Sequence, residues 1–566
     1  MLKESLSKSR KRFGYVLFYS ALALAFYVML FHYLTDIDYP SVEKTYLDTL
    51  QREKTGENSF KLADNYLQKN KYGLWEIFLE GKPYEIGLAE GKLTKELIGI
   101  QEEAFVEQIN TLVPSPFYLK LLKHGIAWFN KDLDDNIPLV FQQEIFGVSR
   151  SVSSKYNYIA PPYERMLNYH AAHDIGHALQ DLALVGCTSF GLNLNRPDSN
   201  MIIGRNFDFH INEKFSENKL VAFVKPDSGF NFVYVSWASM IGVVSGMNDQ
   251  GLTVTLNAAK SDIPFKSATP ISILAREILQ FASNIEEAVT IANKRHTFVS
   301  EQILIGSAKD NTAIVIEKSP SKSGIYKTDE DFIVSSNHFQ SELFANDENN
   351  VEYMRQSASV YRAERCEQLI EEADTLDVEA AVDILRDKRG LDGKSIGIGN
   401  EKAMCQMISH HAVVFQPERL KMWVSASPYQ LGEFVCYDLK DIFRTGKIIA
   451  DTNLTIAKDT FLLDGSYRNY QIFRDLYKAF EEVVKKGDRI ANYDDLLYDL
   501  IRLNPDYYKS YVLAADYFIA MNDTNNAIDY LQKALSKEFE NTLAKRSVEA
   551  KLRDWKNKRK NKMPNK

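Results

Sequence analysis

The sequence predicts an α+β protein, in which a domain of strands and helices follows an apolar helix and precedes a helical extension. Three observations predict this. Residues 15–34 carry no formal charge, and short β-branched and aromatic segments alternate with helical patterns between about 187 and 445. Beyond about residue 455 the apolar spacing is helical again. With 566 residues, the chain is long enough for two or three hydrophobic cores.

The composition is that of a globular protein, because 45% of the residues are hydrophobic and 25% are charged. The net charge of −8 gives no basis for nucleic-acid binding. The four cysteines, 187, 366, 405 and 436, are too few for a disulfide framework, and no pair has zinc-knuckle or Cys-x-x-Cys spacing. We therefore expect no metal and no cofactor, and the three later cysteines are expected to be ordinary buried or free thiols.

The N-terminus predicts a membrane anchor. The run from Tyr15 to Leu34 is long enough to cross a bilayer as a helix, five basic residues precede it, and Asp36 and Asp38 follow. The positive-inside rule keeps residues 1–14 in the cytoplasm and exports the remainder, so we expect an extracytoplasmic domain on a single span. A cleaved signal peptide is the alternative. The anchor is favoured because the apolar run continues past the small residues at 21, 23 and 25.

Between the anchor and the body, residues 35–72 are polar and charged and are expected to form a helical stalk. Residues 74–81 then read as a strand that ends in a turn, and Pro83 begins a helix with small residues on one face. Residues 95–182 show mainly helical spacing.

The body after Cys187 reads as strands, then helices, then strands. Strands are expected at 201–206, 220–224, 232–235 and 252–256, helices at 270–295, strands at 302–317 and 331–336, helices at 354–388, and strands at 412–415 and 420–424. This order predicts a sandwich of sheets with helices packed on them.

The extension, residues 460–541, reads as helical. Residues 508–541 fit one tetratricopeptide (TPR) repeat, with small and large residues at the expected positions: Tyr511, Ala514, Ala515, Phe518, Ala527, Leu531 and Ala534. One repeat cannot bury its own faces, so the region either caps the neighbouring structure or offers a groove to a protein partner. The basic segment 551–566 is expected to be a solvated, mobile tail.

A thiol and its downstream motifs predict the chemistry. Cys187 lies in Val185–Phe190, and the segments Gly204–Phe209 and Gly246–Leu252 follow it. This order resembles the N-terminal-nucleophile (Ntn) amidohydrolases, in the branch of acyl-CoA:6-aminopenicillanic acid (isopenicillin N) acyltransferase, related to bile salt hydrolase and acid ceramidase. The Gly81–Gly91 segment is similar to the element that opens the pro-region of this branch. The resemblance covers about residues 73–445 and implies a four-layer αββα sandwich, with a pro-region at 73–186 and a catalytic core at 187–445.

The resemblance also implies the site residues. Cleavage between Gly186 and Cys187 would make Cys187 an N-terminal nucleophile whose own α-amine is the base. Arg205 would hold the thiolate and the substrate region, and Asp208 the α-amine. Among the residues further along the chain, Asn257 would donate to the oxyanion, Asn337 would lie near the cysteine, and the late site arginine would be Arg362, with Arg365 as the alternative.

The residues themselves leave simpler interpretations open. Arg205 and Asp208, three apart on a strand, point to opposite faces unless a turn or bulge lies near Phe207, and they could be a surface ion pair. Asn257 and Asn337 could be turn residues. The glycine before Cys187 would tolerate the strained backbone that an N-to-S acyl shift needs.

A histidine cluster precedes the nucleophile. His170, His173 and His177, with Asp174, have helical spacing, and His173 and His177 could present two imidazoles to a metal. A role in self-cleavage and a purely structural helix are the other interpretations. The structural helix is favoured, because the glutamate of His-Glu-x-x-His is absent and Gly176 weakens the helix.

The sequence therefore predicts an exported, membrane-anchored cysteine amidohydrolase or acyltransferase. It would cut itself at Gly186–Cys187 and then cleave or transfer the acyl group of a linear, small-molecule N-acyl amide through a thioester. The expected partners are this substrate, the membrane and a possible protein at the TPR-like region, without nucleic acid. A non-catalytic membrane scaffold and a metallohydrolase that uses the histidine cluster are the competing hypotheses.

Overall fold

A computed structural model describes residues 2–113, 115–179, 186–196, 199–209, 213–262, 267–488 and 493–562. Its larger sheet has eleven strands in the order β1-β2-β3-β4-β7-β8-β9-β10-β11-β12-β13. Their bounds are β1 Glu53–Gly56, β2 Ser59–Leu62, β3 Asn65–Lys69, β4 Trp75–Gly81, β7 Leu220–Pro226, β8 Phe232–Ser236, β9 Ser245–Asn248, β10 Leu252–Ala258, β11 Glu301–Ser307, β12 Thr312–Lys318 and β13 Ser323–Tyr326.

The smaller sheet has seven strands in the order β14-β5-β6-β15-β16-β17-β18. Their bounds are β5 Thr188–Leu192, β6 Ile202–Asp208, β14 Phe332–Ser335, β15 Ser409–Gln416, β16 Lys421–Ser425, β17 Phe434–Asp438 and β18 Ala450–Ile456. The strands expected from the sequence in the catalytic body are all present within a few residues of their expected bounds.

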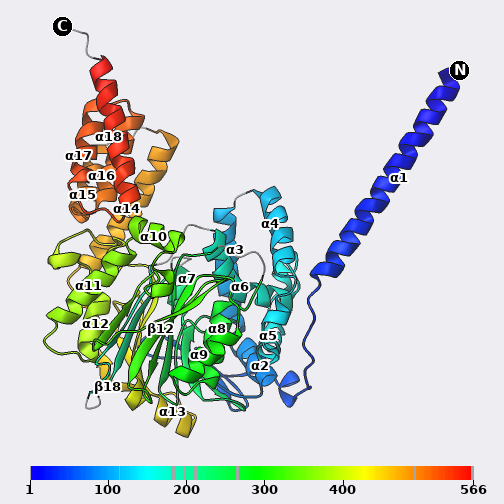
Figure 1. Cartoon of the computed structure of the whole chain (residues 1–566), viewed down its shortest axis with the longest axis horizontal. Helices are drawn as coiled ribbons and strands as arrows, with labels where there is room; N and C mark the ends of the chain where they lie inside the picture. The colour runs from blue at the N-terminus through cyan, green and yellow to red at the C-terminus, as the bar shows by residue number, and fades with distance from the viewer. Residues whose placement is uncertain are drawn as a thin grey trace.

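The two sheets face each other between helices. Helices α8 (Ile271–Phe281) and α9 (Ile285–Lys294) cover the outer face of the larger sheet. Helices α11 (Ser359–Glu372) and α12 (Val378–Arg386) cover the smaller one, and Figure 1 shows these two helices on the opposite side of the strands from α8 and α9. The body is thus an α+β sandwich in four layers, as the sequence and its resemblance predict.

The expected helical stalk is wrong. Residues 53–69 form β1, β2 and β3, which extend the larger sheet through antiparallel pairing to β4. β4 in turn pairs in parallel with β7, from Trp75 opposite Leu220 to Gly81 opposite Pro226. Residues before Cys187 therefore build part of the sheet that the catalytic body completes.

Five helices lie between β4 and Cys187 in the described part of the chain, and two of them, α5 and α6, contact α8. The five are α2 Pro83–Leu93, α3 Lys95–Leu112, α4 Pro116–Phe129, α5 Leu139–Ser149 and α6 Pro162–Leu179, and α1 (Leu2–Thr35) extends away from the body (Figure 1). The small residues expected on one face of α2 have a clear role. Gly87 meets α5 so closely that a Cβ would lie 1.9 Å from the backbone oxygen of Glu144.

A buried ion pair joins the same region to the body. Arg276 of α8 donates Nη2 to Glu144 Oε2 at 2.9 Å and Nη1 to Glu144 Oε1 at 3.2 Å. Glu90 of α2 lies beside this pair, and burial, followed by the charge of Glu144, raises the pKa of the Glu90 carboxyl to about 8. Removal of one partner from such a pair leaves an uncompensated buried charge, so the contact ties α5 to α8.

The remaining helices include the C-terminal extension. They are α7 Glu213–Glu217, α10 Glu348–Gln356, α13 Leu439–Thr445, α14 Ser466–Lys486, α15 Tyr493–Leu503, α16 Tyr508–Ala520, α17 Thr524–Leu535 and α18 Thr542–Lys562. Helices α16 and α17 pack against each other, and α14, α15 and α18 pack on them, so this region is helical as expected, whereas the TPR repeat itself stays a prediction. The expected mobile tail is wrong as far as residue 562, since α18 continues to Lys562.

The close contact of α2 with α5 gives a stability prediction. We expect Gly87→Ala to lower the free energy of unfolding by about 3 kcal/mol or more, because the methyl group meets backbone that cannot move aside. The matched control is Gly99→Ala in α3, where no atom lies within 4 Å of an added Cβ. It should raise stability by about 0.5–1 kcal/mol through helix propensity. Urea unfolding of both variants measures the difference, and equal effects would contradict the packing explanation.

Candidate active site around Cys187

Cys187 lies immediately before β5, the strand between β14 and β6. Only 1% of the residue is exposed, and its thiol lies 3.7 Å from the backbone oxygen of Asp208. Burial raises the pKa of Cys187 to about 11, although the nearby charge of Arg205 opposes the shift. The Cys187 side chain is therefore a neutral thiol at pH 7.

Both backbone polar groups of Gly186, the residue before the thiol, are hydrogen-bonded. Gly186 donates its N–H to the Asp208 backbone oxygen at 3.1 Å, and its carbonyl accepts from Gln406 Nε2 at 2.7 Å. A Cβ on Gly186 would lie 2.3 Å from Gln406 Oε1. The φ of Gly186 is not in the left-handed region. The lack of room for a side chain beside Gln406, rather than an unusual backbone conformation, therefore explains why residue 186 is a glycine.

Arg205 reaches the thiol from β6 through the space between the two sheets. Its Nη2 lies 3.8 Å from Cys187 Sγ and also donates to the Leu256 carbonyl. Its Nη1 donates to the Val244 carbonyl at 2.8 Å. These two backbone carbonyls fix the position of the Arg205 guanidinium. Its positive charge can then stabilise a thiolate at Cys187.

Asp208 lies on the other side of the Gly186–Cys187 peptide. Strand β6 runs unbroken to Asp208, and the irregularity expected near Phe207 lies in the partner strand, between Ser409 and His411. The Asp208 Oδ2 accepts from Gln406 Nε2 at 3.1 Å, whereas Oδ1 has no hydrogen bond among the residues that the structure describes.

Burial governs the charge of this carboxyl group. It raises the pKa of Asp208 to about 7, against a hydrogen bond from Ser409 and the charges of Arg362 and Arg205, which lower it. A buried carboxylate with an unpartnered oxygen has room for one further donor, such as an α-amine.

The two asparagines lie on either side of β14. Asn257, in β10, donates Nδ2 to the Ser335 carbonyl at 3.0 Å and accepts from Ser189 Oγ at 3.1 Å. Asn337 donates Nδ2 to the Ala258 carbonyl at 3.0 Å. Both side-chain amides are thus hydrogen-bonded to neighbouring strands. Asn257 contacts β5, the strand that follows Cys187, and β14, whereas Asn337 contacts β10.

Of the two late arginines, the structure brings Arg362 to this site. Arg362 donates Nε to Thr188 Oγ1 at 3.3 Å and Nη2 to Asn337 Oδ1. Arg365 instead pairs with Asp387, with Nε 3.0 Å from Oδ2. Arg205, Asp208 and Arg362 therefore contact the Gly186–Thr188 segment that contains Cys187. Asn257 and Asn337 adjoin it through Ser189 and Arg362 respectively, and Arg365 does not join them.

Arg205 also begins a series of contacts between buried polar side chains that was not predicted from the sequence. Ser245 Oγ accepts from Arg205 Nη1 and lies 2.8 Å from His411 Nε2. His411 Nδ1 in turn lies 2.8 Å from His410 Nδ1. Burial lowers the pKa of both histidines well below the ordinary value, so both are neutral at pH 7. The His-His pair at the start of a predicted strand was the only signal for this chain of contacts in the sequence.

The histidine cluster before the nucleophile divides into two parts. His170 uses both ring nitrogens, with Nδ1 2.7 Å from the Met166 carbonyl and Nε2 accepting the Ile241 N–H at 3.0 Å. This is a structural role that connects α6 to the body. The side chains of His173, Asp174 and His177 lie outside the described residues. Within the described part of the chain, no group of three or more His, Cys, Asp or Glu residues could hold a metal ion.

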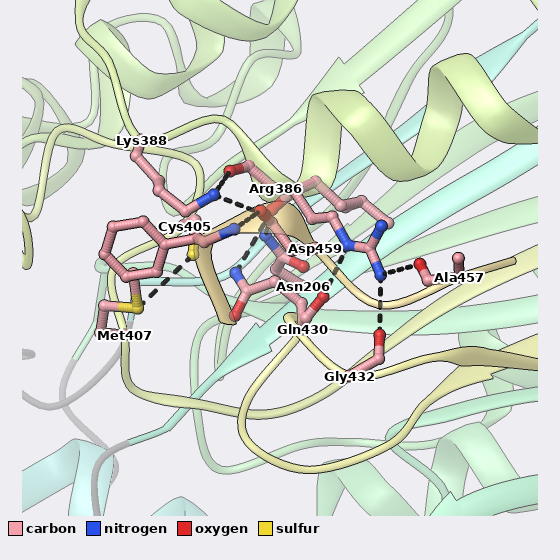
Figure 2. Close-up of polar contacts among 11 residues, drawn as sticks. Asn206, Arg386, Lys388, Cys405, Met407, Gln430, Gly432, Ala457 and Asp459 are labelled. Atoms are coloured by element: carbon pink, nitrogen blue, oxygen red, sulfur yellow. Dashed lines mark hydrogen bonds and ion pairs between the residues drawn. The ribbon is translucent and has the colours of Figure 1, made fainter. Parts of the chain in front are cut away.

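The opposite face of β6 is fixed to the loops around it. Asn206 donates Nδ2 to the carbonyls of Leu385 and Met404, both at 2.9 Å. Figure 2 shows Asn206 near Arg386, whose guanidinium donates to three backbone carbonyls, those of Gln430, Gly432 and Ala457. Strand β6 is therefore held from both faces, which fixes Arg205 and Asp208 on either side of Cys187.

Comparison with known proteins supports the family resemblance. Residues 194–427 match the family model described as acyl-coenzyme A:6-aminopenicillanic acid acyl-transferase. The resemblance to the acyltransferase branch of the Ntn hydrolases is thereby confirmed for this part of the chain. The match begins after Cys187 and covers less than half of the chain.

Two curated proteins and two solved structures are similar to the chain. An uncharacterized protein of Archaeoglobus fulgidus is 25% identical over 271 residues, which cover 45% of this chain and 45% of that protein. Protein dcd1B of Dictyostelium discoideum is 22% identical over 262 residues, which cover 43% of this chain and 50% of dcd1B. The chain thus spans about half the length of these curated relatives. An N-acylethanolamine-hydrolyzing acid amidase ortholog of Caenorhabditis elegans has 18% identity and a TM-score of 0.32, covering 41% of this chain and 93% of its own. A conjugated bile acid hydrolase of Clostridium perfringens has 14% identity and a TM-score of 0.31, covering 47% of this chain and 96% of its own.

The raised pKa of Asp208 gives a pH-dependent prediction. A carboxyl group whose pKa is higher in the folded chain destabilises the fold as pH rises from about 4 to about 7, because the folded state holds the proton longer. In a Cys187→Ala background, Asp208→Asn should therefore stabilise the chain by on the order of 2–4 kcal/mol at pH 8 and by much less at pH 4.

Unfolding midpoints at the two pH values measure this effect. The control is Asp374→Asn, an exposed carboxylate in the loop before α12, which should shift the midpoint by the same small amount at both pH values. A stability difference for Asp208→Asn that is independent of pH would contradict a protonated, buried Asp208.

Proposed function

We propose that the chain is a cysteine amidohydrolase or acyltransferase that cuts itself between Gly186 and Cys187 and then acts on a small N-acyl amide. The observation that carries this proposal is the setting of one peptide bond. Its carbonyl accepts from Gln406, the adjacent thiol lies beside the Arg205 guanidinium, and the Asp208 carboxylate beyond it has an unpartnered oxygen. A nucleophile, a polarised carbonyl and a carboxylate ready for an amine are the parts that self-cleavage needs.

The first reaction releases the α-amine. Cys187 Sγ attacks the Gly186 carbonyl carbon, the Gly186–Cys187 C–N bond breaks, and the thiol proton passes to the departing nitrogen. The acyl group is then a thioester on Cys187, and water hydrolyses it to a Gly186 carboxylate and a free thiol. Gln406 Nε2 stabilises the developing oxyanion on the Gly186 oxygen, and Asp208 Oδ1 accepts a hydrogen bond from the new amine.

Turnover repeats this chemistry on a substrate. The α-amine takes the Cys187 thiol proton, the thiolate attacks the substrate amide carbonyl, and the amine product leaves with the proton. Water or a second amine then attacks the thioester, which gives hydrolysis or acyl transfer respectively. The matching family model is described as an acyl-transferase, and this favours a small N-acyl amine as the substrate.

We also propose that α1 is an uncleaved, single-pass anchor that holds the body outside the cytoplasm. The segment Tyr15–Thr35 is long and apolar enough to cross a membrane, and none of it is buried against the body. Helix α4 adds an apolar surface beside it, because Phe31 stacks on Trp128 with ring centroids 6.3 Å apart. Four large apolar side chains of α4 are exposed on this surface: Phe117, Tyr118, Leu121 and Trp128. A bilayer that receives α1 would also cover these residues.

Intact mass and N-terminal sequencing of the membrane-fraction protein test both proposals at once. We expect two chains, the second beginning Cys-Thr-Ser-Phe, and a first chain that retains residues 1–35. Cys187→Ala should remain one chain, whereas the control Cys366→Ala, which removes another buried thiol, should be cut normally. A single uncut parental chain would refute self-cleavage and favour the non-catalytic scaffold. A first chain that lacks the apolar segment would refute the anchor alone.

The two late arginines provide a matched pair for turnover. Arg362→Met should lower kcat/KM for an N-acyl amide by about 100-fold, since it removes a charged donor that holds Thr188 and Asn337 beside the nucleophile. Arg365→Met breaks the Asp387 pair and should lower the unfolding temperature, but leave kcat/KM of the folded enzyme within about threefold. Equal losses of kcat/KM in both variants would refute the assignment of Arg362 to the site.

A further inference from the structure

Three residues of the loop 394–408, which precedes β15, supply contacts that shape the site. Gln406 holds the Gly186 carbonyl and Asp208, and the Glu401 carbonyl accepts from Arg362 Nη1 at 2.9 Å. Asn206 binds the Met404 carbonyl. We call this segment the 394–408 loop. It contains no helix or strand, so contacts with other elements must hold its shape.

The opposite side of this loop contacts the C-terminal extension. Asn504, just after α15, accepts the Ile398 N–H at 3.0 Å on Oδ1 and donates Nδ2 to the Ile398 carbonyl at 2.9 Å. Only 2% of Asn504 is exposed. One buried side chain thus satisfies both backbone groups of one loop residue, and this fixes the loop at that point.

Two further contacts follow along the loop. Asn400 donates Nδ2 to the Glu538 carbonyl at 3.3 Å, and Lys402 forms an ion pair with the Glu538 carboxylate. Gly397 has a φ of 85°, and a Cβ there would lie 2.5 Å from Tyr507 Cα. The backbone of the extension therefore lies directly against the loop, with no space for a side chain between them.

We infer that the C-terminal extension, which the structure describes as helices α14 to α18, is a positioning element of the active site. By holding residues 397–402 of the loop, it sets where Gln406 meets the Gly186 carbonyl and where the Glu401 carbonyl meets Arg362. The inference rests on the proposed function of that site. Since the extension contacts neither the thiol nor the carbonyl, it acts through the loop, and it pre-organises donors that would otherwise sample many positions.

The same contacts explain why the extension is attached to this body. The core of Cys405, Met407, Tyr429 and Leu431, two of which belong to the loop, meets α14 through Tyr467 and Tyr470. The extension is thus a cap whose free energy of packing is coupled to the conformation of the 394–408 loop.

Two variants break the contact, and a third is the control. Asn504→Ala removes both hydrogen bonds to Ile398, and Lys402→Met removes the Glu538 pair while it retains an apolar side chain of similar length. Lys551→Met removes a comparable pair with Asp516 inside the extension, remote from the loop. Lys402→Met serves if Asn504→Ala fails to fold.

The first measurement is hydrogen–deuterium exchange of the full chain in a Cys187→Ala background, so that all variants have the same covalent state. Asn504→Ala and Lys402→Met should speed exchange in peptides that contain Gln406 and Gly186, and Lys551→Met should not. Unchanged exchange at Gln406 and Gly186 in both loop variants would overturn the inference, whether or not the protein cuts itself.

The second measurement is the rate of Gly186–Cys187 cleavage with Cys187 intact. Asn504→Ala should slow cleavage by about tenfold, as expected when a buried hydrogen-bonded pair is lost and a donor moves away from the reacting carbonyl. The control Lys551→Met should cleave at the parental rate. Cleavage at the parental rate in both loop variants would overturn the inference. A parental protein that never cuts itself would instead refute the proposed function, and the hydrogen–deuterium exchange result would then decide whether the extension positions the loop.

Discussion

The amide of Gln406 is the contact on which the rest of the site depends. Its Nε2 donates to the Gly186 carbonyl at 2.7 Å and to Asp208 Oδ2 at 3.1 Å, so one side chain connects the peptide before the thiol to the buried carboxylate. A side chain at position 186 would displace this amide, because a Cβ there would lie 2.3 Å from Gln406 Oε1. Since a neutral amide is buried here only with its hydrogen bonds satisfied, Gln406 also constrains the loop that carries it.

Burial determines which groups around the thiol carry charge. It favours the neutral forms of Cys187, Asp208, His410 and His411 at pH 7 or close to it. The guanidinium of Arg205 stays charged and is fixed by backbone carbonyls and by Ser245. Positive charge is therefore in place before negative charge develops on the thiol, an arrangement that favours a thiolate or an oxyanion without reorganisation.

The segment before Cys187 is part of the folded body, although it would become a separate chain after cleavage. Its strand β4 pairs with β7 over seven residues, and its Glu144 forms a buried pair with Arg276. These contacts do not include the Gly186–Cys187 bond, so the two chains would stay associated through a shared sheet and a shared core. The proposed cut would change the chemistry of one residue and leave the architecture in place.

The sequence by itself predicted the strands and helices of the α+β body, because apolar periodicity is a local property of the chain, and its family resemblance predicted the layers and the candidate site residues. It missed β1, β2 and β3, since β1 is exposed throughout and the other two strands bury only Leu62, Asn65 and Leu67, too few apolar positions to distinguish this segment from a polar stalk. Only the tertiary structure selected Arg362 over Arg365, and it brought together Gln406, Ser245 and His411, which are far apart in the sequence. Such contacts arise when loops and strands from distant segments pack against β6, and no local spacing encodes them.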